Sequence, residues 1–189
     1  MLQPIVAKRI QLVGLDVDGV MTDGGVYMGE GPDGPTELKR FDIQDTIGIK
    51  LLMTAELEVV IVSGRFSEAT KIRAEELGIR TVIQDPKARK LAPFEQLLKE
   101  RDLRMDQAAF LGDDLTDLPL LRRVGIPAAV QNAVAEVREL ATVVTTAAGG
   151  HGAVREFAEL LLKARGQWDD VVRKYLVDRG DTSQRLSSA

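Results

Sequence analysis

Short apolar runs alternate with stretches of helical periodicity along this chain. The apolar runs cover residues 10–15, 59–62, 81–83 and 108–111, and each is followed by a helical pattern rather than by another strand. Strands that alternate with helices are typical of a parallel sheet, because the helix carries the chain back to the start of the next strand. The pattern predicts an α/β fold with a doubly wound, Rossmann-like parallel sheet.

Four helices are expected, three between these strands and one after the last of them. Residues 47–53 have the spacing of a helix with one buried stripe. Ser67 can cap a helix that Gly78 terminates. Residues 90–100 and 132–140 complete the set.

The first strand ends in two carboxylates. Asp16 and Asp18 follow the apolar run directly, and at this spacing they repel each other unless a cation or a shared proton intervenes. Mg²⁺ would relieve the repulsion, since it prefers oxygen ligands and usually takes one or two protein carboxylates. The alternative is a solvated acidic turn.

Further polar residues follow other predicted strands. Asp113, Asp114 and Asp117 come just after residues 108–111, and Ser63 follows residues 59–62. Open parallel sheets bind ligands outside the carboxyl ends of their strands, where the strand order reverses. Asp16, Asp18, Ser63 and Asp113 therefore converge if the first and fourth strands are neighbours.

This set of residue types suits attack on a phosphate ester. Asp16 can act as the nucleophile where Mg²⁺ and a fixed ammonium neutralise the charge that develops on the phosphoryl group. Asp18 can protonate the leaving oxygen and then take a proton from the hydrolytic water.

Phosphate oxygens also need donors. Ser63-Gly64-Arg65 offers a hydroxyl and backbone N–H groups near a helix start, although Ser63 can equally be a plain helix cap. Lys90 or Lys87 can supply the ammonium, and an exposed lysine is the alternative for either.

Composition fits one compact domain. The chain has 189 residues, no cysteine, a net charge of −4 and 4% aromatic residues. We expect a single domain over residues 1–165, including a hairpin at 25–42, and a C-terminal helix and tail at 166–189, with residues 178–189 unpacked in the isolated chain. The composition favours neither a nucleic-acid nor a membrane partner, and the lack of cysteine suits the cytoplasm.

The ordered motifs resemble those of the haloacid dehalogenase-like superfamily of aspartate-nucleophile phosphatases. The matching residues are Asp16-Val17-Asp18-Gly19-Val20, Ser63, Lys90 and Gly112-Asp113-Asp114. More narrowly, residues 16–24, 27–28, 38–41, 62–65, 112–119 and 149–156 resemble the 3-deoxy-D-manno-octulosonate 8-phosphate phosphatase family. That family acts on a sugar-acid phosphate in lipopolysaccharide biosynthesis.

The resemblance implies roles for individual residues. Asp16 would be the nucleophile and Asp18 the acid/base, with Ser63 and Lys90 as phosphate ligands. Mg²⁺ would be held by Asp16, the backbone carbonyl of Asp18 and Asp113. Asp114 and Asp117 would lie behind these ligands, and a solvated acid at a helix start is the alternative for Asp117.

Substrate choice would fall to Arg65, Gly64 and His151. A related nonulosonate phosphatase family has Glu at the place of Arg65, so Arg65 favours the octulosonate ester. Pairing of Arg65 with Glu68 on a helix surface is the alternative. His151 stands where Arg or Lys is usual, and it can contact a carboxylate or be a solvent-exposed loop residue.

Three other functions stay open at this point. One is a phosphatase for a nonulosonate 9-phosphate or another small phosphate ester. Another is a non-catalytic oligomerisation domain of the same family, against which the intact Asp16, Asp18, Lys90 and Asp113 argue. The third is a receiver-like phosphorelay domain, which would not need Ser63.

No lid domain fits between Gly24 and the helix near Ile47. Val26, Met28, Leu38 and Phe41 predict two short strands around a turn at residues 29–35, and an isolated hairpin is marginal in water. The family resemblance implies a homotetramer in which hairpins form a central barrel and each subunit caps a neighbour's active site. A hairpin folded over its own sheet is the alternative.

Overall fold

The computed structural model describes residues 2–32 and 34–182. Its centre is a six-stranded parallel sheet with the strand order β5-β4-β1-β6-β7-β8. The strands are β1 (Leu12–Leu15), β4 (Glu58–Ser63), β5 (Thr81–Gln84), β6 (Ala108–Gly112), β7 (Ile126–Ala129) and β8 (Val143–Val144). The α/β fold with a doubly wound parallel sheet is confirmed.

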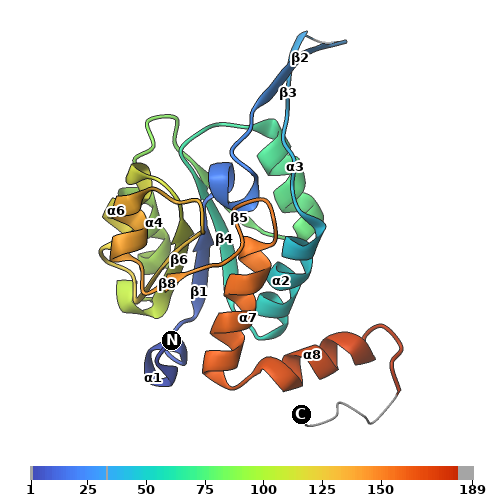
Figure 1. Ribbon diagram of the computed structural model, residues 1–189, viewed down its shortest axis with the longest axis vertical. Coiled ribbons are helices and arrows are strands. Elements are labelled where there is room, and N and C mark those ends of the chain that lie inside the picture. Colours follow the sequence, from blue (N-terminus) through green and yellow to red (C-terminus); the bar gives the residue numbers. More distant parts are fainter. Residues whose placement is uncertain (1, 33, 183–189) are drawn as a thin grey trace.

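Helices cover both faces of the sheet (Figure 1). On one face lie α2 (Ile43–Thr54), α3 (Glu68–Leu77) and α7 (Ala153–Arg165); on the other lie α4 (Leu91–Glu100) and α6 (Ala135–Leu140). The short helices α1 (Pro4–Ala7) and α5 (Leu118–Leu121), and α8 (Trp168–Val177) near the C-terminus, complete the chain. Fully buried side chains such as Phe94, Phe110 and Phe157 fill the space between layers. Burial of this apolar surface is the main force that holds the layers together.

Local signals account for several helix ends. The Ser67 hydroxyl accepts a hydrogen bond from the backbone N–H of Thr70 at 3.3 Å, and Gly78 ends α3 in the left-handed conformation with φ +75°. Both expectations are confirmed. The fourth helix begins at Ala135 rather than Asn132, because the Asn132 side chain accepts a hydrogen bond from the N–H of Gly149 at 2.7 Å. Asn132 therefore anchors a distant loop instead of starting a helix.

The hairpin consists of β2 (Tyr27–Gly31) and β3 (Gly34–Leu38). The expected hairpin is confirmed, but its turn is tighter than the expected 29–35, because antiparallel pairing continues to Gly31 and Gly34. The hairpin projects away from the sheet (Figure 1), and its Met28 side chain is 68% exposed. The alternative of a hairpin folded over its own sheet is therefore wrong for this structure.

The C-terminal part after α7 contains α8, whose Val171 is buried. Residues 178–182 are exposed, and the rest of the tail expected to be unpacked, 183–189, lies outside the described residues. Within the described part of the chain, no helix has both the length and the apolar character needed to cross a membrane.

Candidate active site

The carboxyl ends of three adjacent strands bring the candidate residues together. Strand β1 pairs with β4 on one side and with β6 on the other, and Leu15 is in register with both Ile61 and Leu111. Asp16 directly follows β1, Ser63 ends β4, and Asp113 directly follows β6. The expected adjacency of the first and fourth predicted strands is confirmed, and it explains how residues almost a hundred positions apart share one site.

Lys90 lies between two buried carboxylates. Its Nζ is 2.9 Å from Oδ1 of Asp16 and 2.6 Å from Oδ1 of Asp117, and all three side chains are almost completely buried. Burial disfavours the ammonium charge, but the two acids outweigh it and raise the pKa of Lys90. Lys90 is therefore a fixed positive charge beside Asp16.

Asp117 holds this cluster together through both of its carboxylate oxygens. Besides Lys90, it accepts hydrogen bonds through Oδ2 from the backbone N–H groups of Asp113 at 2.9 Å and Asp114 at 3.3 Å. Both of its oxygens are thus occupied, and its side chain is inaccessible to solvent. The alternative of a solvated helix-start acid is wrong for Asp117.

Asp113 has a buried oxygen without a protein partner. Its Oδ1 makes no hydrogen bond to any described residue. Burial, followed by the charges of Asp16 and Asp117, raises the pKa of Asp113 to about 8; burial, with Asp117, raises that of Asp16 to about 7. If all three are ionised, Asp16, Asp113 and Asp117 carry more negative charge than the single ammonium of Lys90 can balance.

A divalent cation fits this donor set. Asp16, Asp113 and Asp117 each offer an oxygen, and these atoms lie within 4.8 Å of one another. Because Asp117 already serves Lys90 and two backbone N–H groups, Asp16 and Asp113 are the carboxylates left to bind a metal. Hard oxygen donors of this kind suit Mg²⁺.

Glycines let the backbone approach this cluster closely. A Cβ on Gly19, which has φ +89°, would lie 2.1 Å from Oδ2 of Asp113. A Cβ on Gly149 would lie 1.7 Å from the carbonyl oxygen of Gly19, so the loop before α7 packs directly on the segment after β1. No side chain fits at either position without displacing the site.

Ser63 and Gly64 lie at the end of β4, on the other side of β1 from Asp113. The Ser63 side chain is buried, and its Oγ accepts a hydrogen bond from the N–H of Arg65 at 3.2 Å. A Cβ on Gly64 would lie 2.9 Å from Cβ of Ala88 and 3.6 Å from Cε of Lys90. The glycine therefore brings this strand end against the turn that carries Lys90. Lys87 in the same turn is exposed.

The Asp18 carboxylate turns toward the base of the hairpin. Lys39 forms an ion pair with its Oδ1, and Nη1 of Arg65 lies 3.8 Å from its Oδ2. Arg65 also donates to Glu37 at 2.8 Å, whereas Glu68 pairs with Lys71. The surface pairing of Arg65 with Glu68 is therefore wrong.

Lys39 and Glu37 were missed in the sequence, although both lie on or beside the predicted hairpin. Glu37 accepts a hydrogen bond from the Ser67 hydroxyl at 2.6 Å, which holds the pKa of this carboxyl below its usual value. In the sequence, Glu37 and Lys39 are marked only as two charges at alternate positions, and that pattern is equally typical of a solvated strand.

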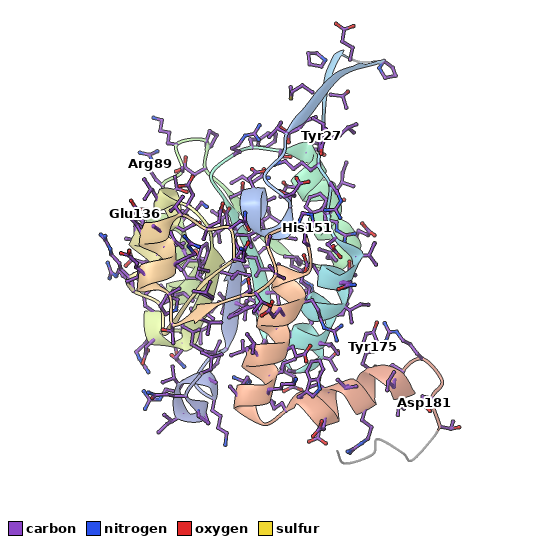
Figure 2. The ribbon with its side chains drawn as sticks, in the orientation of Figure 1. Tyr27, Arg89, Glu136, His151, Tyr175 and Asp181 are labelled. Carbon is purple, nitrogen blue, oxygen red and sulfur yellow. The ribbon has the colours of Figure 1, made fainter. Side chains whose placement is uncertain are left out.

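His151 and Asp114 lie at the edge of the site. His151 is exposed on the loop before α7 (Figure 2), with Nδ1 2.9 Å from the carbonyl oxygen of Gly149. Arg40 donates to the carbonyl of Gly150 at 2.7 Å and so ties this loop to the chain after β3. Asp114 is exposed and accepts a hydrogen bond from the N–H of Leu115 at 2.7 Å.

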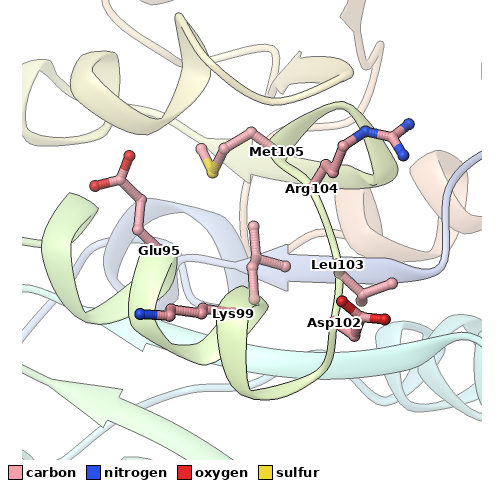
Figure 3. A pocket seen from close by; sticks show the side chains of 7 residues that line it. Glu95, Lys99, Asp102, Leu103, Arg104 and Met105 are labelled. Carbon is pink, nitrogen blue, oxygen red and sulfur yellow. The ribbon is translucent and has the colours of Figure 1, made fainter.

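A separate hollow of about 330 Å³ lies at the other end of the sheet (Figure 3). Its lining comes from α4 and from the connection to β6: Glu95, Leu98, Lys99, Asp102, Leu103, Arg104 and Met105. This connection precedes β6, so the hollow is at the amino ends of the strands. It is remote from the carboxylate cluster.

A parallel sheet with an aspartate, a buried lysine and a second aspartate at its carboxyl edge defines a haloacid dehalogenase-like hydrolase, and the sequence model of that family matches residues 81–157. The chain is 40% identical over 164 residues to the 3-deoxy-D-manno-octulosonate 8-phosphate phosphatase KdsC of Escherichia coli K12, covering 87% of this chain and 85% of that protein. The chain belongs to the 3-deoxy-D-manno-octulosonate 8-phosphate phosphatase family.

Solved structures of similar proteins match this chain in fold. A probable YrbI family phosphatase from Pseudomonas syringae matches with a TM-score of 0.84 and 44% identity, over 92% of this chain and 96% of that one. The 3-deoxy-D-manno-octulosonate 8-phosphate phosphatase of Moraxella catarrhalis, in complex with magnesium, phosphate and a KDO molecule, matches with a TM-score of 0.84 and 36% identity. That match covers 91% of this chain and 97% of the other.

Proposed function

We propose that this protein is a Mg²⁺-dependent phosphatase that hydrolyses 3-deoxy-D-manno-octulosonate 8-phosphate through an aspartyl-phosphate on Asp16. The observation that carries the proposal is the contact of Asp16 with the buried Lys90, next to the unpartnered oxygen of Asp113. The family membership and the ligands named for the Moraxella protein support the same substrate class and metal.

Asp16, Asp113 and the backbone carbonyl of Asp18 would hold the metal. Bound Mg²⁺ supplies positive charge beside the phosphoryl group. The fit rests on the buried Asp16 and the half-buried Asp113, whose oxygens lie within 4.8 Å of each other, and on the unpartnered Oδ1 of Asp113.

The chain's own residues carry the reaction. An oxygen of Asp16 attacks phosphorus while Lys90 and Ser63 hold the phosphate oxygens, and the ester oxygen leaves with a proton from Asp18. Water then attacks the aspartyl-phosphate and gives its proton to Asp18. Inorganic phosphate and free Asp16 result, so the cycle closes.

Arg65, Gly64 and His151 are proposed to recognise the sugar acid. Arg65 is 45% exposed beside Asp18, and its planar fork suits a carboxylate or sugar hydroxyls. The His151 imidazole, on the loop before α7, would form a hydrogen bond to the same sugar acid.

The hairpin supports a homotetramer with active sites at subunit interfaces. Val26, Tyr27, Met28 and Leu38 are all exposed large hydrophobic residues on or beside the hairpin. A second copy of the chain would bury them, and a two-stranded hairpin gains stability from such a neighbour. The cytoplasmic location stays a prediction.

The proposal is tested with Asp16→Asn and with EDTA. Asp16→Asn keeps the shape of the side chain but removes the nucleophile, so turnover of the octulosonate ester should fall at least about a thousandfold, or about 4 kcal/mol of barrier. Phosphate release measures turnover, and circular dichroism checks the fold. Full activity in the variant or in EDTA would falsify the mechanism.

A further inference from the structure

Lys39 has a buried ammonium at the foot of an exposed hairpin. It directly follows β3, yet its side chain is 0% exposed. A charged group taken out of water needs charged partners, because the loss of hydration is otherwise uncompensated. Lys39 has two such partners, Asp18 in direct contact and Glu37 at 3.6 Å.

The Asp18 carboxylate is held by residues from outside its own segment. Asp18 precedes Gly19, whose φ of +89° interrupts the turn after β1. Among the described residues, the ion pairs to Asp18 come from Lys39 and, at 3.8 Å, from Arg65. Lys39 fixes Oδ1, which leaves Oδ2 as the oxygen for proton transfer.

Glu37 anchors both cations. It accepts hydrogen bonds from Arg65 at 2.8 Å and from the Ser67 hydroxyl at 2.6 Å, at the start of α3. The foot of the hairpin is thereby connected to the protein body through α3 on one side and through Asp18 on the other. Lys39 is the member of this group in direct contact with the candidate acid/base, whereas Arg65 lies 3.8 Å from it.

We propose that Lys39 is a positioning residue for Asp18. The inference rests on the proposed function, in which the phosphorus–oxygen bond breaks as a bond to Asp16 forms and the departing oxygen takes a proton from Asp18. A carboxyl group that can rotate freely delivers this proton poorly, because proton transfer requires hydrogen-bond distance to the departing oxygen. Lys39 restricts that rotation and acts only through Asp18.

The test uses a series of aryl phosphates whose leaving groups range from p-nitrophenol to unsubstituted phenol. Good leaving groups depart without a proton, whereas poor ones depend on Asp18. kcat/KM reports the steps up to phosphoryl transfer, so later hydrolysis of the aspartyl-phosphate does not affect it. The slope of log kcat/KM against leaving-group pKa is therefore the readout.

Lys39→Met keeps most of the side-chain length without the charge. A positioned proton donor contributes about 10²–10⁴-fold, so we expect a loss of about tenfold or more for phenyl phosphate. For p-nitrophenyl phosphate the change should stay within about threefold, and the slope should steepen. Lys39→Gln, which retains a donor, should lie between Lys39→Met and the parent protein, and both folds are checked by circular dichroism. Lys71→Met, an exposed lysine on α3, is the matched control and should leave the slope unchanged.

A double-variant comparison shows whether the effect passes through Asp18. Asp18→Asn should steepen the slope further, and adding Lys39→Met to it should cause no further loss. Equal losses along the aryl series, or losses that multiply in the double variant, would overturn the proposal. A parent protein that hydrolyses none of the series, or an Asp16→Asn variant that retains activity, would instead refute the proposed function.

Discussion

Asp45 provides a stability prediction whose size follows from its surroundings. It lies in α2 and is only 3% exposed. Its Oδ1 accepts a hydrogen bond from the N–H of Arg155 at 2.8 Å in the first turn of α7, while its Oδ2 has no partner among the described residues. Burial raises the pKa of Asp45 to about 6 from an ordinary value of 3.8, although the α7 backbone opposes the shift.

The direction of the pH dependence follows from proton binding by Asp45. Between pH 4 and 6 the folded state holds a proton on Asp45 that the unfolded state has released, so this group stabilises the fold at low pH and loses that contribution as the pH rises through 6. The rise of the Asp45 pKa from 3.8 to about 6 corresponds to about 3 kcal/mol of unfolding free energy. Asp45→Asn removes the titration and keeps an acceptor for Arg155.

Urea unfolding of both proteins at pH 4 and pH 7 measures the effect. The free energy of unfolding of the wild type, relative to Asp45→Asn, should fall by about 2–3 kcal/mol between these two pH values. Other titrating groups occur in both proteins, so their contributions to the difference in unfolding free energy cancel. Met53→Leu on the same helix is the control, and its difference from the wild type should not depend on pH. A constant difference for Asp45→Asn would refute the reasoning.

Three further predictions concern the site and the hairpin. Lys90→Met should abolish ester hydrolysis, whereas Lys87→Met should retain it within about threefold, because of these two lysines it is Lys90 that contacts Asp16. Phosphate release measures both variants, and equal losses would contradict the assignment. Arg65→Ala should lower kcat/KM for 3-deoxy-D-manno-octulosonate 8-phosphate about ten- to hundredfold but barely change p-nitrophenyl phosphate hydrolysis, and equal losses on both substrates would place Arg65 at the phosphate. Val26→Asp with Met28→Lys should break up the proposed tetramer, giving smaller species in sedimentation, and should lower activity; a fully active monomer would contradict the proposed shared active site.

The sequence alone predicts the parts of the fold that follow a simple hydrophobic pattern. The strands β1, β4 and β6 each contain a continuous apolar run, and their shared carboxyl edge follows from parallel pairing. Asp16, Ser63 and Asp113 could therefore be placed together before their distances were known.

Contacts that depend on how one element leans on another could not be predicted. The pairing of Lys39 with Asp18 requires the hairpin to rise at one particular angle, and neither strand's periodicity specifies that angle. The burial of Asp117 required knowing that its carboxylate folds back onto the N–H groups of residues 113 and 114. Strands β7 and β8 and helix α7 were not recognised, because β8 has only two residues and the sequence before α7 is dominated by glycine and alanine.

The central position of β1 has a consequence for how the protein acquires activity. Strand β1 must pair with β4, about 46 residues later, and with β6, about 96 residues later, before Asp16 and Asp113 lie side by side. Contacts between residues so distant in the chain form slowly, because the intervening loop entropy is lost first. During synthesis, β6 is also made long after β1. Catalytic competence should therefore appear only at the final ordering of the sheet, and refolding followed by enzyme activity should lag behind refolding followed by helix content.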